Sequence, residues 1–259
     1  MSFLALGVDR RGDEPPRSDT MLLATVDVAS KKASVVSIPR DLLVEIPGLG
    51  QERINAAFSA GEQERPGGGV ARARQVVEQN FHVSVPHWAV VDFHCFRTAV
   101  DAVGGMYLDV PTRIVDPEYP DESYGTMEVA FEPGFQWMDG ERALQYARTR
   151  HADSDFGRMR RQQLVLSALR TQLVTLQRLP VLPSVLDGCR GFSSDLPLID
   201  LITLAFTARS IPEDSIQLTV IDERLTRPSI LPGGAEVLTP NWNAIRSTVR
   251  AALPVMARG

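Results

Sequence analysis

The sequence predicts an α/β domain with a mixed β-sheet between helices, and three observations support this fold class. Three short apolar runs, at residues 3–8, 21–28 and 33–38, are rich in Val, Leu and Ile and are separated by Asp, Gly and Lys turns. Such runs predict adjacent core strands. Helical and strand patterns then alternate along the chain. Neither a linker-like stretch nor an internal repeat interrupts the 259 residues, which predicts a single domain over residues 1–259.

The middle of the chain continues this alternation. Helical periodicity at about residues 68–80 and 93–103 flanks a strand-like segment at residues 88–91. The Gly104-Gly105 pair then breaks the second helix, and residues 106–110 predict another short strand.

Two aspartates mark the starts of the next helices. Asp139 is predicted to cap a helix over about 140–149, and Asp155 a long helix over about 157–178, because Asp accepts hydrogen bonds from the first free N–H groups of a helix. The preceding segment, residues 112–125, is rich in proline and acids and predicts a surface loop. The remaining predicted elements are a short strand at 128–131, a helix near 197–210, a strand at 216–221 and a last helix near 241–252.

The composition excludes several classes of protein. A hydrophobic content of 44% and a charged content of 23% are typical of a globular chain. A net charge of -5 disfavours nucleic acid as a partner, because phosphate backbones are bound by a broad positive surface. No window approaches about eighteen consecutive apolar residues, so no membrane-spanning helix is expected within this chain. Cys95 and Cys189 fit one disulfide in an oxidising compartment or two thiols in a reducing one.

A dense cationic segment lies between Arg142 and Arg161, where six arginines accompany two aspartates in an acidic protein. The planar guanidinium group matches phosphate oxygens and stays charged at any working pH. The segment therefore predicts an anion site, with phosphate as the leading candidate. Arg148 and Arg150 cannot share one helical face, so the helix is expected to end there and both side chains to converge. A surface cation near a helix C-terminus is the alternative for Arg148.

The long predicted helix turns polar side chains inward at its N-terminal end. Its buried stripe, which includes Val165, continues backwards to Gln162 and Arg158. A buried cation is costly unless it is paired. Arg158 must therefore meet either a bound anion or an internal carboxylate, for which Asp153 and Asp155 are the candidates.

Near the N-terminus, charged residues lie at the ends of predicted strands. Asp9 lies where the first strand ends, Asp19 where the second begins, and Arg40 follows Pro39 at the end of the third. In open α/β sheets, ligands collect at such an edge. Two carboxylates on neighbouring strand ends suit Mg²⁺, which prefers one or two carboxylates together with waters and substrate phosphates. Turn formation is the alternative role for each aspartate taken alone.

These segments together resemble the LytR-CpsA-Psr family, whose members are cell-envelope phosphotransferases that move glycopolymers from a polyprenyl pyrophosphate carrier onto peptidoglycan. The resemblance covers about residues 3–170, in the family's order, and residues from 171 onward contain no matching segment. The matching segments are Leu6–Arg11, Arg17–Met21, Ser37–Asp41, Arg53–Phe58, Val91–Phe93, Val103–Gly105, Asp139–Arg150 and Asp153–Gln163.

The resemblance implies a single three-layer α/β/α domain with a central mixed β-sheet. It implies that Asp9 and Asp19 are metal ligands that hold Mg²⁺, the expected cofactor, on the pyrophosphate. The implied catalytic residues are Arg40, Arg148, Arg150 and Asp155, and the implied pyrophosphate-binding residues are Arg53, Arg158 and Gln162. Arg53 stands where relatives often have lysine, so the charge is kept but the geometry differs.

The reaction implied by the resemblance is transfer of a lipid-linked glycopolymer to a sugar hydroxyl of the peptidoglycan acceptor. The protein is then expected at the extracytoplasmic face of the bacterial membrane, which it contacts through its lipid substrate. The N-terminal anchor helix typical of the family is not found in this chain. Two alternatives stay open: a hydrolase that cleaves polyprenyl pyrophosphates with water, and a regulatory protein that binds the polyprenyl phosphate without turnover.

Overall fold

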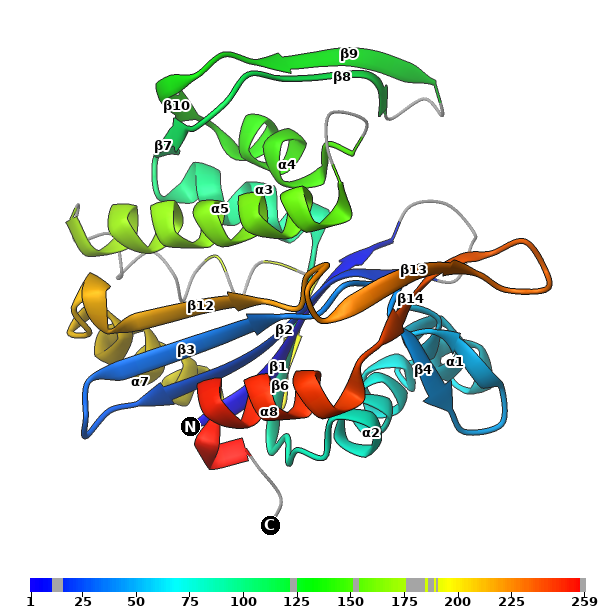
Figure 1. Cartoon of the computed structure of the whole chain (residues 1–259). Coiled ribbons are helices and arrows are strands. Elements are labelled where there is room, and N and C mark those ends of the chain that lie inside the picture. Colours follow the sequence, from blue (N-terminus) through cyan, green and yellow to red (C-terminus); the bar gives the residue numbers. More distant parts are fainter. Residues whose placement is uncertain are drawn as a thin grey trace. The chain divides into compact units, whose positions relative to one another are not determined.

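The computed structural model describes residues 1–10, 16–121, 125–150, 154–175, 185, 189 and 191–256 (Figure 1). The chain forms two compact units: the first comprises Met1–Asp92 and Gly191–Gly259, and the second comprises Phe93–Arg190. Both units combine helices with strands, and the first contains a central mixed sheet, so the predicted α/β class is confirmed. The expected boundary of one domain over residues 1–259 stays a prediction.

A mixed sheet forms the centre of the first unit. Among the described residues, its strands are, in spatial order, β11 (Phe192–Ser194), β6 (His87–Asp92), β1 (Ser2–Asp9), β2 (Arg17–Asp27), β3 (Lys32–Ser37) and β12 (Ile216–Val220). β2 pairs antiparallel with β1 and β3, whereas β6 pairs parallel with β1 and β12 pairs parallel with β3. The three predicted N-terminal core strands are therefore confirmed, and β2 begins four residues before its apolar run.

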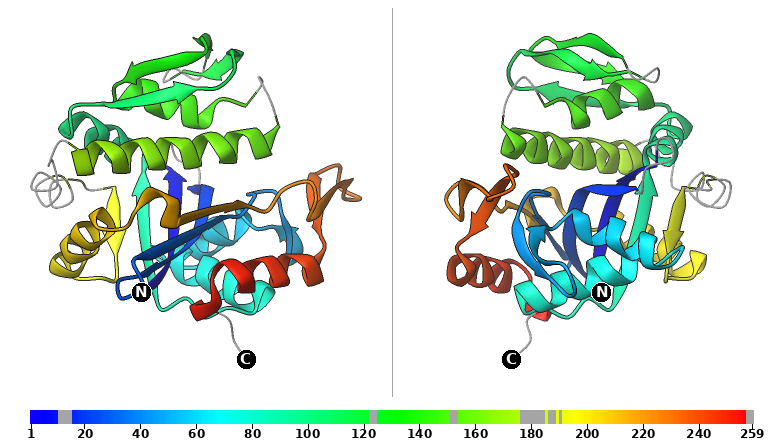
Figure 2. Two further views of the ribbon diagram at one scale, coloured as in Figure 1. Left: turned by 60° about the vertical axis from the view of Figure 1, so that its left-hand side comes forward. Right: turned by 90° about the vertical axis from the view of Figure 1, so that its right-hand side faces the viewer.

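One face of this sheet packs against helices. Buried and half-buried residues alternate along β1, and Leu4, Leu6 and Val8 point into the core. The helices that supply the rest of this core are α1 (Ala56–Glu64), α2 (Gly69–Phe81) and α8 (Trp242–Ala252) (Figure 2). Because side chains of a strand alternate between faces, Asp9 lies on the opposite, half-buried face of the sheet.

The remaining elements of the first unit are short. They are β4 (Leu43–Ile46), β5 (Gly50–Arg53), α7 (Leu198–Arg209), η2 (Glu213–Ser215), β13 (Thr226–Ile230), β14 (Glu236–Pro240) and η3 (Pro254–Met256). β4 pairs with β5 and β13 pairs with β14, each in a two-stranded antiparallel ribbon. No helix in the described part of the chain is long and apolar enough to cross a membrane.

The described part of the second unit combines two antiparallel ribbons with helices. Its elements are α3 (Phe93–Ala102), β7 (Met106–Val110), β8 (Ile114–Pro120), β9 (Thr126–Phe131), β10 (Gly134–Met138), α4 (Gly140–Arg148) and α5 (Asp155–Thr175). β10 pairs with β7 and β8 pairs with β9, both antiparallel. A second apolar core fills this unit, and Tyr146 and Phe131 are its largest fully buried side chains.

The surface loop predicted for residues 112–125 is wrong for most of its length. Residues 114–120 form β8, and Asp116 and Tyr119 are buried. The pairing register with β9 shifts between these two residues, so Pro117 lies at an irregularity where no regular ladder hydrogen bond is required. The content of proline and acids is thus compatible with an irregular strand, and composition alone could not separate the two.

The helix starts agree with one cap prediction and correct the other. Asp139 caps α4, because its side chain accepts a hydrogen bond from a backbone N–H three residues on, at 2.8 Å. Asp155 is not the cap of α5 but its first residue. Ser154 precedes the helix, and its Oγ accepts a hydrogen bond from the N–H of Gly157 at 3.3 Å. Serine caps as well as aspartate does, which leaves the Asp155 carboxylate available for another partner.

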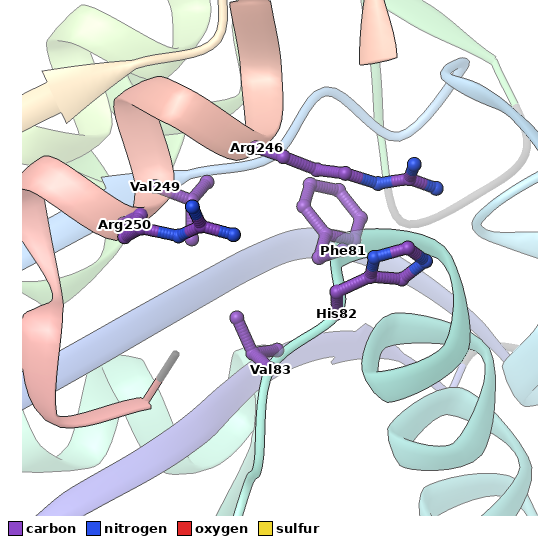
Figure 3. Close-up of a pocket in the computed structure, with 6 residues that line it drawn as sticks. All are labelled: Phe81, His82, Val83, Arg246, Val249 and Arg250. Atoms are coloured by element: carbon purple, nitrogen blue, oxygen red, sulfur yellow. The ribbon is translucent and has the colours of Figure 1, made fainter. Parts of the chain in front are cut away.

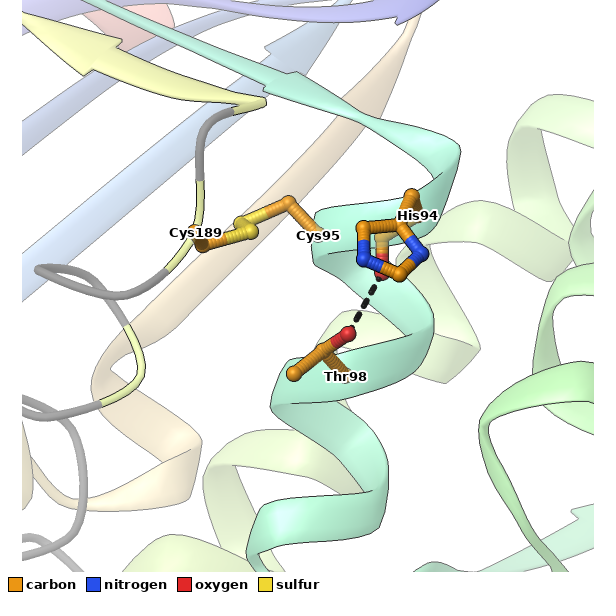
Figure 4. The surroundings of a disulfide bond; sticks show 4 residues. All are labelled: His94, Cys95, Thr98 and Cys189. Carbon is orange, nitrogen blue, oxygen red and sulfur yellow. Dashed lines mark hydrogen bonds between the residues drawn. A yellow bond between two sulfur atoms is a disulfide. The ribbon is translucent and has the colours of Figure 1, made fainter.

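A disulfide joins Cys95 of α3 to Cys189 (Figure 4). Of the two states that the sequence left open, the bonded state is therefore observed. The two cysteines are 94 residues apart. They lie close to the first and last residues of the second unit, Phe93 and Arg190, so the bond closes almost the whole unit into one covalent loop.

Candidate functional site

Asp9 and Asp19 lie on the neighbouring strands β1 and β2. Gly7 is opposite Thr20, whereas the next residue of β1 is opposite Ser18, so Asp19 is the additional residue of a β-bulge. A bulge bends its strand and turns side chains away from their regular direction. Both aspartates are half-buried. Because of the bulge, the Asp19 carboxylate lies at the end of this strand pair, whereas regular pairing would have directed it elsewhere.

Arg40 and Arg53 are connected to this strand end by carboxylates. Arg40 Nη1 donates to Asp19 Oδ1 at 2.8 Å, and Arg40 Nε lies 3.4 Å from Asp41 Oδ2. Arg53 Nε lies 3.6 Å from Asp41 Oδ1 and donates to the carbonyl oxygen of Glu236 at 2.8 Å. Asp19, Arg40, Asp41 and Arg53 therefore form a continuous set of ion pairs in which the sign of the charge alternates.

Asp41 was not among the residues that sequence reasoning selected. It lies within the segment Ser37–Asp41, next to Arg40, but that position alone does not indicate that its two oxygens face two different arginines. The link to Arg53 depends on the path of β4 and β5, which returns the chain to Asp41. This contact could not be read from local spacing.

The helix α4 ends at Arg148, as predicted, and Thr149 follows in a non-helical conformation. The Arg148 side chain is half-buried and not a surface cation: Nη1 donates to the Tyr119 hydroxyl at 3.2 Å, and the guanidinium lies 4.3 Å above the Phe93 ring. Arg150 is exposed, and its backbone N–H donates to Asp116 Oδ2 at 3.0 Å. The backbone between the two arginines is thus anchored to β8, while the convergence of their side chains stays a prediction.

The first turn of α5 contains a buried cation. Arg158 is 2% exposed, and its Nη2 lies 2.8 Å from Asp155 Oδ1. Of the pairing carboxylates expected from the sequence, Asp155 is thus confirmed, and Asp153 lies outside the described residues. Gln162 is also buried, as expected from the stripe, and its Nε2 donates to the carbonyl oxygen of Ala147 at 3.4 Å.

Arg161 is a further buried cation that sequence reasoning missed. Its Nε donates to the carbonyl oxygen of Tyr146 at 3.0 Å, and its Nη2 donates to that of Thr149. Because the last carbonyl groups of a helix have no partner within the helix, these bonds satisfy the C-terminal end of α4. The available signal was the four-residue step from Arg161 to Val165 on the buried stripe. Arg160 is exposed.

Asp9 and Asp19 could complete the coordination of a magnesium ion only together with oxygen atoms from water and from a bound phosphate. Within the described ranges, no three His, Cys, Asp or Glu side chains form a group that could hold a metal ion by themselves. Mg²⁺ usually keeps several waters and takes only one or two carboxylates plus substrate phosphates. Asp9 and Asp19, half-buried at the end of one strand pair, fit that donor set.

A small pocket elsewhere in the first unit has a structural explanation (Figure 3). Its lining residues are Phe81, His82, Val83, Arg246, Val249 and Arg250. Arg246 Nε donates to the carbonyl oxygen of Asn80 at 3.0 Å, and its guanidinium lies 5.1 Å from the Trp242 ring. Arg246 therefore attaches the C-terminal end of α2 to α8, and the predicted site residues do not line this pocket.

Comparison with known proteins places this arrangement in a family. The model of the LytR_cpsA_psr family matches residues 1–247. The teichoic acid transferase TagT of Bacillus subtilis is 33% identical over 228 residues, covering 85% of this chain and 68% of TagT. TagU of Oceanobacillus iheyensis, a protein with the same activity name, is 32% identical over 207 residues, covering 79% of this chain and 61% of TagU. The regulatory protein MsrR of Staphylococcus aureus is 31% identical over 193 residues, or 74% of this chain, which spans only 55% of MsrR.

Solved structures give the same assignment. A structure of TagT bound to LIIa-WTA superimposes with a TM-score of 0.76 at 28% identity, covering 98% of this chain and 91% of TagT. A structure of TagT with bound octaprenyl pyrophosphate lipid gives a TM-score of 0.71 at 25% identity, with 98% and 90% covered. The chain therefore belongs to the LytR-CpsA-Psr family.

Proposed function

We propose that this protein is a phosphotransferase that moves a glycopolymer from a polyprenyl pyrophosphate carrier onto a sugar hydroxyl of peptidoglycan. The observation that carries the proposal is the similarity over 98% of the chain to TagT, which was solved with an octaprenyl pyrophosphate lipid. The names of TagT and TagU describe transfer of teichoic acid from a polyisoprenyl carrier to peptidoglycan. The predicted site residues supply the charges that such a donor requires.

In the first unit, Asp9 and Asp19 are proposed to hold Mg²⁺. When bound, the ion would neutralise charge that develops on the pyrophosphate oxygens. Arg40 is proposed to donate to the same oxygens, since its Nη1 is oriented by Asp19 and its Nε faces Asp41. Arg53 is assigned a supporting part in binding, because it faces Asp41 as well.

In the second unit, Arg148 and Arg150 are proposed to bind the pyrophosphate oxygens at the end of α4. Arg158, held by Asp155, is proposed to add a further cationic group at the start of α5, where the positive end of the helix dipole also favours anions. Gln162 is assigned to binding through its amide group. Fixed cations of this kind stabilise a charged transition state without reorganising at the moment of reaction.

The proposed step is an in-line displacement at phosphorus. The acceptor hydroxyl oxygen forms a bond to the phosphorus nearer the glycan, and the bond from that phosphorus to the bridging oxygen breaks. Polyprenyl phosphate leaves with the electron pair, and the hydroxyl proton passes to a base or to water. The products are a glycan joined to the acceptor by a phosphodiester and a polyprenyl monophosphate, with no covalent enzyme intermediate.

The proposed location is the extracytoplasmic face of the bacterial membrane, with contact to the membrane surface through the lipid donor. The Cys95–Cys189 disulfide supports this location, because disulfides persist in oxidising compartments. The family's named activities in teichoic acid transfer are also reactions of the cell envelope.

The test is product analysis with and without acceptor. Purified protein is incubated with a polyprenyl pyrophosphate-linked saccharide, Mg²⁺ and peptidoglycan fragments, and the products are identified by mass spectrometry. The expected result is a phosphodiester conjugate that forms only when the acceptor is present. Asp9→Asn and Asp19→Asn should each lower the rate at least about 100-fold, whereas Arg160→Ala, on the exposed face of α5, should keep the rate of the unmodified protein.

Two other results would assign a different function. Release of glycan phosphate at the same rate without acceptor would identify a hydrolase, which would use the same residues. Binding of the donor without any change to it, and with equal affinity in the absence of Mg²⁺, would identify a binding protein. The name of the relative MsrR, a regulatory protein, makes the second result worth measuring.

A further inference from the structure

The ribbon of β7 and β10 exposes one face that consists of aromatic side chains. Tyr107, Phe135 and Trp137 are 53%, 73% and 52% exposed. Trp137 is directly opposite Tyr107, and Phe135 is directly opposite Asp109. Because opposed residues of an antiparallel pair project to the same side, these three rings and the Asp109 carboxylate share one face. The other face, which includes Met106, Leu108 and Met138, belongs to the core.

The rings of this face are held in place without a ligand. The Tyr107 and Phe135 rings are stacked, with centroids 5.2 Å apart and an angle of 5° between their planes. Trp137 Nε1 donates to the carbonyl oxygen of Gly104 at 3.3 Å. Gly105 has a φ of +78°, and a Cβ at this position would lie 2.6 Å from Trp137 Nε1, so only glycine lets the indole rest on the backbone here. Preorganised side chains lose less conformational entropy on binding.

Flat aromatic faces favour one class of ligand in particular. The face of an aromatic ring carries a partial negative charge and attracts the weakly positive C–H groups of a neighbouring molecule. A pyranose ring presents such C–H groups on its flat side and hydroxyl or amide donors at its rim. The Asp109 carboxylate can accept a hydrogen bond from a rim donor. The combination of apolar rings with a few polar groups is typical of a ligand site.

The acidic composition of the segment that contains the ribbon disfavours anionic partners. Residues 101–141 contain ten Asp and Glu but only one basic residue, Arg113. That arginine is paired with Glu132 at 2.9 Å. A surface of this sign repels phosphate-rich polymers and anionic lipid headgroups, whereas it tolerates an uncharged polysaccharide. The acidic character of this segment therefore distinguishes the aromatic face from the arginines that are proposed to bind the anionic donor.

We propose that the face formed by Tyr107, Asp109, Phe135 and Trp137 binds the uncharged glycan strand of the acceptor. The identification of this glycan as peptidoglycan rests on the proposed function. β10 leads through Asp139 into α4, which ends at Arg148. Because α4 has nine residues, the helix between the end of β10 and this arginine is about 13 Å long. The face would thus hold the acceptor strand away from the arginine at the end of α4.

The test measures binding of the whole protein to peptidoglycan sacculi from which attached anionic polymers have been removed. The double variant Tyr107→Ala and Phe135→Ala should bind the sacculi about tenfold more weakly, from the loss of two ring contacts. The exchange Tyr107→Phe with Phe135→Tyr keeps both rings and should restore the affinity. Ile230→Ala is the matched control, because Ile230 is 71% exposed on a ribbon of the first unit and should not contribute.

Three further readouts make the outcome decisive. The double variant should keep the affinity of the unmodified protein for the lipid donor and its unfolding temperature, which shows that the loss is specific. Unchanged affinity for sacculi would overturn the proposal. Loss of binding to phosphatidylglycerol or phosphatidylcholine vesicles instead of sacculi would also overturn it, in favour of a membrane contact.

The failure of this proposal can be told from the failure of the proposed function. If the unmodified protein binds sacculi through these rings but never converts the donor, the phosphotransferase assignment fails and the glycan face stands. If the donor is converted and the double variant binds sacculi normally, the glycan face is wrong and the phosphotransferase assignment stands.

Discussion

At the scale of single residues, the pair of Asp155 and Arg158 determines what the start of α5 can do. Arg158 is almost completely buried, whereas the Asp155 side chain is 23% exposed. Removing one partner of a fully buried ion pair costs about 3–5 kcal/mol, and the partial exposure of Asp155 reduces this. We predict that Asp155→Asn lowers the free energy of unfolding by about 2 kcal/mol, measured by urea denaturation.

A bound anion should offset part of that loss. If Arg158 contacts the pyrophosphate, saturating inorganic pyrophosphate with Mg²⁺ should stabilise Asp155→Asn more than it stabilises the unmodified protein. Arg160→Ala, two residues away on the exposed face, should change the free energy of unfolding by less than about 0.5 kcal/mol. Equal stabilisation of both proteins by pyrophosphate would show that Arg158 serves the fold and not the ligand.

At the scale of elements, the bulged strand pair of β1 and β2 positions the two proposed metal ligands. A Cβ at Gly7 would lie 2.9 Å from Thr20 Cβ on the neighbouring strand, which is closer than such atoms approach. Gly7→Ala should therefore separate the strands at the bulge and lower stability by about 1–3 kcal/mol. Because Asp9 and Asp19 flank this contact, Mg²⁺ affinity in calorimetric titration should fall as well.

A double-mutant cycle tests whether the close contact with Thr20 causes the losses of stability and Mg²⁺ affinity in Gly7→Ala. Adding Thr20→Gly to Gly7→Ala removes the close contact and should recover part of both losses. Gly233→Ala is the control, because a Cβ there meets no atom within 4 Å. If the two substitutions at the bulge are additive, the close contact is not what aligns the carboxylates.

At the scale of the whole molecule, the disulfide joins two residues close to the two ends of the second unit. Cross-linking residues 94 positions apart removes more unfolded-chain entropy than a short loop would, about 4–5 kcal/mol in the chain-entropy model. We predict that reduction, or the pair of substitutions Cys95→Ser and Cys189→Ser, lowers the unfolding temperature and separates a first calorimetric transition from a second one. The serine variant should then be insensitive to reductant, and a single unshifted transition in all samples would contradict this.

Features that depend on local interactions were predictable from the sequence, whereas features that depend on contacts between distant residues were not. The strands that contain Asp9 and Asp19, and the strand that ends shortly before Arg40, were predictable, because apolar runs and breakers are local signals. The bulge at Asp19 was not, since it depends on which residues of two strands are opposed. The same reason applies to Asp41, whose second arginine arrives through a ribbon, and to the disulfide, whose partners are far apart in sequence.

Helix periodicity gave partial information about buried cations. It indicated Arg158 and Gln162, and both are buried. The same buried stripe also includes Arg161, four residues before Val165. A buried arginine that caps the end of another helix, however, has no local signature. The irregular strand β8 was not predicted for a related reason. Its prolines and acidic residues are typical of loops, and only its pairing with β9 distinguishes it from a loop.

The most direct test of the central claim is phosphorus NMR of the protein with a polyprenyl pyrophosphate-linked saccharide, Mg²⁺ and a peptidoglycan acceptor, recorded beside the Arg148→Ala variant. The predicted result for the unmodified protein is loss of the diphosphate signals and growth of one phosphomonoester and one phosphodiester signal. The variant should leave the diphosphate signals unchanged over the same time. Persistence of the diphosphate signals in the unmodified protein, with the donor shown to be bound, would contradict a phosphotransferase.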